Sequence, residues 1–373
     1  MTSRRPPDSN FDFFIPAIVD IKWRDQQDTM ERPFFSLSKN KRLKPIEYRS
    51  ARDSLYVNVI PHQEYGMATI WDADILIWAA SVICDLQNKK QNDIPRTLTF
   101  MPYDLLKAIG RGTGGSHYFR LREGLYRLRN TSIETNIRVP RGQKKANFSW
   151  ISEFTDLVDP ETNESRGMSI TLSDWFYEGA LREGGVLAID PRYFQITGGR
   201  ERWLYRVARK HAGGAGREGF AISLPILHEK SGTEGTYRRF KFEIAKIVRE
   251  NDLPGFFLAL EESRQGEAML RMTRREMLNT EEQEAATARA PAKRRAGKKA
   301  SSSSEQLPLL RGQLSVETVA RIRAEFPGWD VFALKADFDA WVHDDPSRTP
   351  ADYAAAFYGY VRQHHTRNRH QLR

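Results

Sequence analysis

Apolar residues along the first part of the chain recur with helical and strand-like spacing in a definite order. The most regular stretch runs from Thr69 to Leu86, where apolar side chains fall three and four residues apart, as on one face of a helix. The predicted elements are a helix over 69–86, a strand over 97–100, a helix over 103–109, a glycine-rich turn over 110–115, a helix over 116–130, and two strands over 133–139 and 148–158 joined by residues 141–146. This order of helix, strand, helix, turn, helix and hairpin predicts a winged-helix domain.

The same order of elements recurs further along the chain. The second set is a helix over 200–210, a strand over 220–224, a helix that opens at Pro225, a turn over 231–235, a helix over 236–250, and hairpin strands over 255–260 and 268–272. An offset of 119 residues brings the apolar stripe of the first long helix onto that of the second, Leu121, Leu125 and Leu128 falling on Phe240, Ile244 and Ile247. The chain therefore carries an internal duplication, and a repeat of this size predicts two copies of one domain.

A change of composition separates these two copies from the C-terminal part of the chain. The stretch ATARAPAKRRAGKKASSSS has almost no apolar residues, which predicts a flexible linker. Beyond it, helical apolar stripes predict a small helical module. The predicted division is a flexible N-terminal arm (1–30), a first winged-helix domain (31–195), a second winged-helix domain (196–278), a disordered basic linker (279–313) and a helical module (314–366), which makes the fold class α+β.

Composition points to a polyanionic partner. The 373 residues include 58 Lys and Arg against 48 Asp and Glu, a formal charge of +10. The excess is concentrated: residues 111–145 carry nine basic and two acidic side chains, and residues 196–250 carry twelve and six. Nucleic acid is the commonest polyanion that a cytoplasmic protein meets. The single cysteine, Cys84, excludes a disulfide-stapled scaffold, and no apolar run approaches a membrane span, so we expect a cytoplasmic protein.

The long helix of each copy turns basic residues away from its apolar stripe. An α-helix fits the major groove of DNA, where Arg can bond a guanine edge and Ser or Asn can bond a base or a phosphate. The candidate DNA contacts are Ser116, Arg120, Arg127 and Asn130 in the first helix, Arg238, Arg239, Lys246 and Arg249 in the second, and Arg141, Lys144 and Lys145 in the first hairpin turn. The alternative is that these are solvated faces of ordinary helices and a solubilising turn. The duplication favours DNA contact.

Several longer strings resemble one known family. MERPFFSLSKNKRLKPIEY (30–48), EYGMATIWDADILIWAAS (64–81), TGGSHYFRLREGLYRL (113–128) and GWDVFALKADFDAWV (328–342) are similar to the plasmid replication initiator protein A family of proteobacteria. The resemblance implies an initiator that binds repeated sites at a plasmid origin through tandem winged helices, remodels the adjacent duplex and recruits the host replisome. A winged-helix transcriptional repressor and a strand-cutting and rejoining enzyme are the rival hypotheses. The 30–48 segment either packs on the first domain or forms a homodimer contact.

A short motif follows the basic linker. Gln306, Leu307, Leu309 and Leu310 resemble the pentapeptide by which bacterial replication proteins bind the sliding clamp, although Leu310 stands where an aromatic residue is usual. The glutamine amide would bond at the rim of an apolar pocket that the closing leucines fill. The alternative is that these leucines dock on the C-terminal module.

Motifs of nucleotide-driven or metal-dependent chemistry are not found in the sequence. No Gly-x4-Gly-Lys-Ser/Thr loop occurs, and the glycines of 110–115 follow a predicted helix rather than a strand. The adjacent His364 and His365 lack the spacing of a metal pair. We therefore expect a DNA-binding protein without catalytic activity, cofactor or metal.

Overall fold

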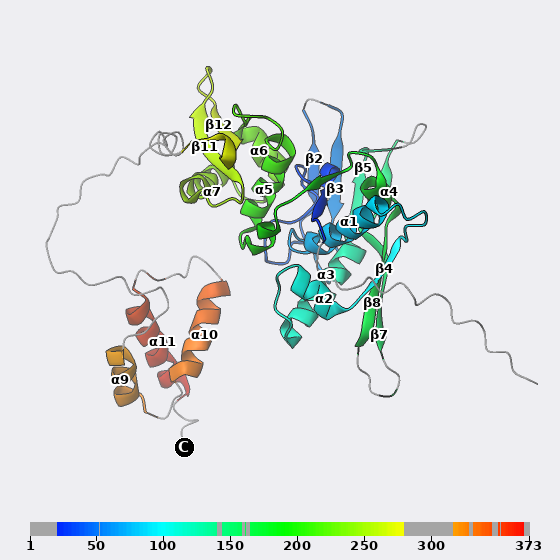
Figure 1. Cartoon of the computed structure of the whole chain (residues 1–373). Helices are drawn as coiled ribbons and strands as arrows, with labels where there is room; N and C mark the ends of the chain where they lie inside the picture. The colour runs from blue at the N-terminus through cyan, green and yellow to red at the C-terminus, as the bar shows by residue number, and fades with distance from the viewer. Residues whose placement is uncertain are drawn as a thin grey trace, which may run out of the picture. The chain divides into compact units, whose positions relative to one another are not determined.

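The computed structural model describes residues 21–51, 53–139, 144–158, 161, 165–279, 316–327, 331–344, 350 and 352–368. The chain divides into two compact units, Met1–Lys293 and Arg294–Arg373 (Figure 1). Both predicted winged-helix regions lie in the first unit, on either side of residue 195. The predicted clamp motif at 306–310 and the predicted contact Arg141 lie outside the described residues.

The first half of unit 1 is built on a helix that is apolar on nearly every side. Helix α1 (Ala73–Asn88) has all its residues from Ala73 to Ile83 buried, as expected of a helix in the middle of a core. The elements that follow it are β4 (Thr97–Phe100), α2 (Pro102–Ala108), α3 (Gly115–Asn130), β7 (Ile151–Val158) and β8 (Ser165–Leu172). Pro102 stands in the first turn of α2, where its missing N–H costs nothing. The three strands form an antiparallel sheet in the order β4-β8-β7.

The second half repeats this arrangement closely. Its elements are α5 (Gly199–His211), β10 (Phe220–Ser223), α6 (Leu224–Ser231), α7 (Tyr237–Glu250), β11 (Phe256–Glu262) and β12 (Ala268–Arg274), all within a few residues of the predicted bounds. The sheet order, β10-β12-β11, matches β4-β8-β7 of the first half. Thr236 caps α7 by accepting a hydrogen bond from the backbone N–H of Arg239. Figure 1 shows α5, α6 and α7 gathered with the β11–β12 hairpin.

The first hairpin was assigned incorrectly from the sequence. Strand β5 (Ser132–Thr135) does pair with β6 (Ala146–Phe148), but these strands belong to a separate sheet, ordered β2-β3-β5-β6. The partners that complete that sheet are β2 (Ile46–Arg49) and β3 (Tyr56–Ile60). The hairpin that corresponds to β11–β12 is β7–β8. The β5–β6 and β7–β8 strands have similar alternation of apolar and polar residues, so the sequence pattern does not distinguish the two hairpins. The pairing of β5 with the distant strand β3 places β5 in the other sheet.

The predicted flexible arm over 1–30 is wrong for residues 21–30. Strand β1 (Arg24–Gln26) pairs with β9 (Val186–Ala188), which follows α4 (Asp174–Leu181). Three short 3-10 helices lie at Gln27–Thr29, Pro191–Gln195 and Arg275–Met277. Asp25 is buried and accepts two hydrogen bonds from the guanidinium of Arg206 in α5, Nε to Oδ2 at 2.6 Å and Nη2 to Oδ1 at 3.0 Å. Because Arg206 is distant in sequence, local sequence alone does not indicate a partner for Asp25, and the segment is therefore predicted to be flexible.

The 30–48 segment packs on both halves of unit 1. Phe35 stacks on Trp150 of the first half, with ring centroids 4.7 Å apart. Arg42 donates from Nη1 to the carbonyl oxygen of Gly232, 2.6 Å away, at the end of α6. Gly232 has φ +60°, and a Cβ there would meet Pro33 at 2.5 Å, so glycine is required at this crossing. The predicted packing on the first domain is therefore found, and it extends to the second half.

A buried carboxylate at the start of α1 joins the two halves. Asp74 is fully buried, and its Oδ2 accepts a hydrogen bond from Arg111 at 2.9 Å. Its Oδ1 accepts one from Nη1 of Arg202 in α5 at 2.6 Å. Arg202 also donates to the carbonyl oxygens of Ile196 and Phe194. This one acidic side chain therefore ties the turn before α3 and the first helix of the second half to α1.

Unit 2 is a small helical module. Its helices are α9 (Val316–Glu325), α10 (Val331–Asp344) and α11 (Tyr353–Asn368). They bury a common apolar core of Ile322, Phe326, Val331, Leu334, Phe338, Phe357 and Val361. Most of these residues come from the stripes that predicted the module.

We predict that Asp74→Asn destabilises unit 1 by about 3 to 5 kcal/mol, because it leaves the buried Arg202 guanidinium without its anion. Urea unfolding followed by the fluorescence of the buried tryptophans measures this change. Asp85→Asn on the same helix is the matched control: it breaks an exposed pair with Lys89, and we expect a loss of under about 1 kcal/mol. Equal losses in the two variants would contradict the role given to Asp74.

Candidate nucleic-acid interface

The first half of α3 presents a polar surface to solvent. Ser116 and Arg120 are exposed, and within the described part of the chain Arg120 makes no ion pair. The preceding turn leads directly into this helix, whose N-cap is Gly114. The structure therefore places these two predicted contacts where a bound duplex could reach them.

Arg127 is turned inward, and its prediction as an open DNA contact is wrong. Its Nε and Nη2 each donate to one oxygen of Asp72, at 2.8 Å in both cases, and Asp72 is buried. Asp72 also accepts hydrogen bonds from the backbone N–H and hydroxyl of Thr69. Gly124, one turn earlier, lets the two helices approach, since a Cβ there would meet Asp72 at 2.8 Å. Arg127 thus positions α3 against the start of α1.

Asn130 is also engaged within the protein. Its Nδ2 donates to the carbonyl oxygen of Tyr126 at 2.8 Å, one turn back on the same helix. The helical wheel treated residues 116–130 as one open face. The structure shows that this face is open at Ser116 and Arg120, whereas Asp72 holds Arg127 and the backbone of α3 holds Asn130.

Helix α7 keeps all four of its predicted cations at the surface. Arg238, Arg239, Lys246 and Arg249 are exposed. Arg239 pairs with Glu243 at 3.0 Å, and Lys246 lies 3.6 Å from Glu250; in both pairs the cation is well exposed. Such exposed pairs hold a cation weakly, so it stays available to a phosphate. Exposed Lys241, at the edge of this face, escaped the prediction because its wheel position lies beside the stripe.

The predicted wing lysines lie on the β5–β6 connection. Lys144 is exposed, and Lys145 binds Glu134 at 2.6 Å, a hydrogen bond that raises the pKa of Lys145. The hairpin that corresponds to a wing in the first half, β7–β8, instead carries exposed Glu153, and its Asp156 pairs with Arg122. In the second half, exposed Arg264 lies in the β11–β12 turn. The wing prediction is therefore corrected for the first half.

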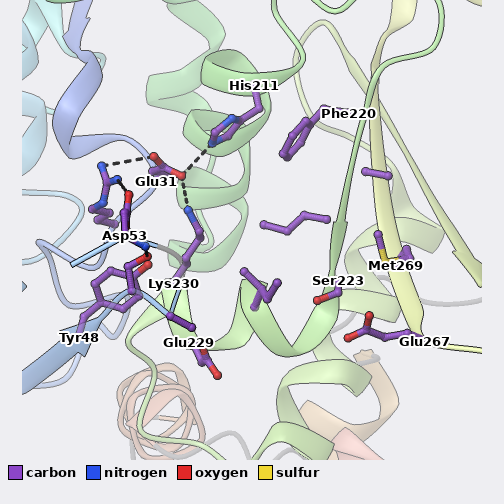
Figure 2. A pocket seen from close by; sticks show the side chains of 16 residues that line it. Glu31, Tyr48, Asp53, His211, Phe220, Ser223, Glu229, Lys230, Glu267 and Met269 are labelled. Carbon is purple, nitrogen blue, oxygen red and sulfur yellow. Dashed lines mark hydrogen bonds and ion pairs between the residues drawn. The ribbon is translucent and has the colours of Figure 1, made fainter. Parts of the chain in front are cut away.

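A cavity of about 500 Å³ lies between the two halves of unit 1. Its walls come from residues 31–53 on one side and from α5, β10, α6 and β12 on the other. Figure 2 shows Glu31 in contact with His211 and Lys230 at one side of this space. Glu31 accepts hydrogen bonds from Lys210 at 2.8 Å and from His211 Nε2 at 2.9 Å, and it also binds Lys230.

Glu31 is an ion-pair anchor for α5 and α6. Burial by itself would raise the pKa of Glu31, but the hydrogen bonds from His211, Lys210 and Lys230 outweigh it and lower the pKa well below the ordinary value. The cations around the cavity are thus committed to a carboxylate of the same chain. This arrangement suits the joining of the two halves better than the binding of a polyanion.

Neither a metal cluster nor a membrane-spanning helix occurs among the described residues. In that part of the chain no three His, Cys, Asp or Glu side chains come together as a metal site would require. None of the helices described is long and apolar enough to cross a bilayer.

We predict that unit 1 loses stability as the pH falls below about 4.5, the ordinary pKa of Glu31. Because the folded protein holds this pKa low, the stabilisation is complete above the unfolded pKa and is lost as protons are forced onto the carboxylate. Glu31→Gln should cost about 3 kcal/mol at neutral pH and much less at pH about 3. Unfolding in urea at both pH values measures the difference.

The control for this measurement is Glu276→Gln, which alters an exposed pair with Arg274. We expect it to change stability by under about 1 kcal/mol at either pH. A Glu31→Gln deficit that stays constant between the two pH values would contradict the assignment.

Comparison with known proteins places the chain in a family. The sequence model of the family named replication initiator protein A matches residues 24–258. A protein of Wigglesworthia glossinidia brevipalpis named "Putative replication protein" is 33% identical over 249 residues, which are 66% of this chain and 88% of that protein. Two crystal structures of domains 2 and 3 of RctB are similar at 13% and 12% identity, with TM-scores of 0.46 and 0.44. They cover 66% and 70% of this chain and 96% and 99% of those chains. By the extent of the family match, the chain belongs to the replication initiator protein A family.

Proposed function

We propose that this protein is a plasmid replication initiator that binds repeated sites in origin duplex DNA and recruits the host replication machinery. One observation supports this most: α3 and α7 hold the same place in two repeated element orders, and both turn cations outward. Arg120 and Arg239 are exposed and are related by the offset of 119 that aligns the two apolar stripes. Membership of the family directs the proposal to replication, and the paired basic helices direct it to DNA.

In this proposal each half of unit 1 acts as a winged-helix domain. The order α5-β10-α6-α7-β11-β12, with a three-stranded antiparallel sheet, supports that assignment. The first half has the corresponding sheet and the same order, except that β5 and β6 are inserted between α3 and β7. Helix α3 would then enter a major groove with Ser116 and Arg120, and α7 with Arg238 and Arg239. Lys246 and Arg249, further along α7, would contact phosphates.

The proposed mechanism is binding rather than catalysis, without a cofactor, on plasmid DNA in the cytoplasm. Not every arginine is open to DNA in this proposal. Arg127 and Arg206 bind buried carboxylates of the same chain. The protein would supply a rigid pair of helix faces, and the energy for remodelling the duplex would come from binding at those faces. A strand-cutting enzyme would instead form a covalent tyrosine adduct with DNA.

We predict that Lys246→Ala and Arg249→Ala each weaken binding to origin DNA and flatten its salt dependence. Removal of one cation from a phosphate should reduce the slope of log K against log salt concentration by about one unit. Footprinting on the DNA that flanks the coding region defines the site, and titration at several salt concentrations measures the slope. Arg192→Ala is the control, because Arg192 is exposed but lies outside α3 and α7 and pairs with Asp190.

The same DNA separates the initiator from a repressor. Opening of the duplex beside the protected repeats, detected with a single-strand-specific reagent, is expected of the initiator. Protected repeats without any opening favour a winged-helix repressor. An unchanged footprint after substitution of Arg120, Arg238 and Arg249 together would show that α3 and α7 are not the DNA-binding faces.

We further propose that Gln306, Leu307, Leu309 and Leu310 bind the bacterial sliding clamp. Gln306→Ala combined with Leu309→Ala should abolish retention of the full chain by immobilised clamp, because the variant has neither the rim hydrogen bond nor one of the apolar anchors. Binding to origin DNA should stay unchanged in the same variant. Unaltered clamp retention would refute this contact.

A further inference from the structure

Two phenylalanines stand out on the surface of unit 1. Phe119 is 66% exposed and Phe242 is 54% exposed, the two largest values among the large apolar side chains of the described residues. Each lies on the solvent side of one proposed recognition helix, Phe119 on α3 and Phe242 on α7. On the same helices Tyr126 and Tyr237 are exposed to a smaller extent, 37% and 36%, and Phe240 on the opposite face of α7 is 1% exposed. Full burial of such a side chain is favourable by roughly 1.5 to 3 kcal/mol. A partner that covers either ring would therefore gain part of this free energy.

The surroundings of both rings are polar or charged. Residues three and four apart on a helix are surface neighbours, so Phe119 lies beside Ser116, Arg122 and Glu123. By the same spacing, Phe242 lies among Arg238, Arg239 and Lys246. A protein partner usually covers a contiguous apolar patch, whereas each of these rings is set among polar and charged side chains. Around Phe242 the charge is positive and complementary to a polyanion, whereas Arg122 beside Phe119 pairs with Asp156 and exposed Arg120 follows Phe119 in the helix.

Duplex DNA offers one apolar group on the floor of its major groove, the C5 methyl of thymine. We propose that Phe119 and Phe242 contact thymine methyl groups while the neighbouring arginines bond phosphates and base edges. The inference rests on the proposed function and adds to it a rule of sequence choice. Both rings lie in the N-terminal half of their helices, the part that reaches base edges when a recognition helix enters the groove.

The rule concerns which bases the site contains. Each bound segment would carry a thymine beside the position that Arg120 or Arg238 contacts. A contact of this kind is specific, because cytosine presents a bare edge where thymine presents its methyl. The two rings would therefore select A·T pairs at two defined positions, and the arginines would supply most of the affinity.

The test uses the full chain and the duplex defined by footprinting, in which thymines are replaced one at a time by uracil. Uracil pairs with adenine as thymine does but lacks the C5 methyl. We expect unmodified protein to lose about threefold to fivefold in affinity at one position for each ring, the factor for burial of one methyl-sized group. Phe119→Ala should bind more weakly and show no further loss when the thymine at its own position is replaced, while remaining sensitive at the position of Phe242.

Matched variants make the result decisive. Phe119→Leu keeps an apolar side chain, so it should retain part of the preference for thymine if the side chain contacts the methyl group. If the ring instead stacks on an unpaired base, the leucine variant should lose the effect of the ring. Tyr103→Ala removes an exposed aromatic ring from α2 and should leave the preference unchanged. Because Phe119 and Tyr103 are both exposed, circular dichroism should show the same folded helix content in every variant.

Failure of the inference and failure of the proposed function look different. If the protein protects no duplex at all, the proposed function fails. If it protects the origin with equal affinity for thymine and uracil at every position, the function stands and methyl recognition is overturned. A loss on Phe119→Ala that is equal for the two bases would assign the ring to stacking or to contact with a second copy of the chain.

Discussion

The geometry of unit 1 depends on two carboxylates in the first turn of α1. Asp72 holds Arg127 of α3, and Asp74 holds Arg111 and Arg202. Both acids lie where the helix dipole favours negative charge, and both are removed from water. A guanidinium offers fixed donors in one plane, so each pair restrains orientation as well as distance. The two aspartates at the start of α1 therefore restrain the orientation of α3 and the position of α5.

This arrangement divides the arginines of the chain into two groups. One group, which includes Arg202 and Arg206, is buried and neutralised by carboxylates of the same chain. The other group, which includes Arg120 and Arg249, remains at the surface. The formal charge of +10 counts both groups alike, although only the second can attract a polyanion. The buried ion pairs of the first group fix the helices that carry the second group, and the proposed DNA contact depends on that rigidity.

The sequence predicted local elements well and long-range partners poorly. The helices and strands of the second half fall within a few residues of their predicted bounds, because each is defined by periodicity and by nearby turn residues. Three errors, concerning residues 21–30, the first wing and Arg127, share a cause. Each depends on a partner distant in sequence, β9 for β1, β3 for β5 and Asp72 for Arg127. A helical wheel cannot show that a buried aspartate lies opposite one of its polar positions.

The two halves are similar in fold but unequal in their surfaces. Helix α3 gives up Arg127 to Asp72, while Lys246, its counterpart at the offset of 119, stays exposed. The β7–β8 hairpin carries exposed Glu153, and in the β11–β12 hairpin exposed Arg264 lies between exposed Glu262 and Glu267. If both helices enter DNA, the second half supplies most of the electrostatic attraction, and the first depends more on the fit of a few side chains. Under the proposed function, this difference would let one half supply more of the affinity and the other more of the selectivity, because the two demands would not fall on the same residues.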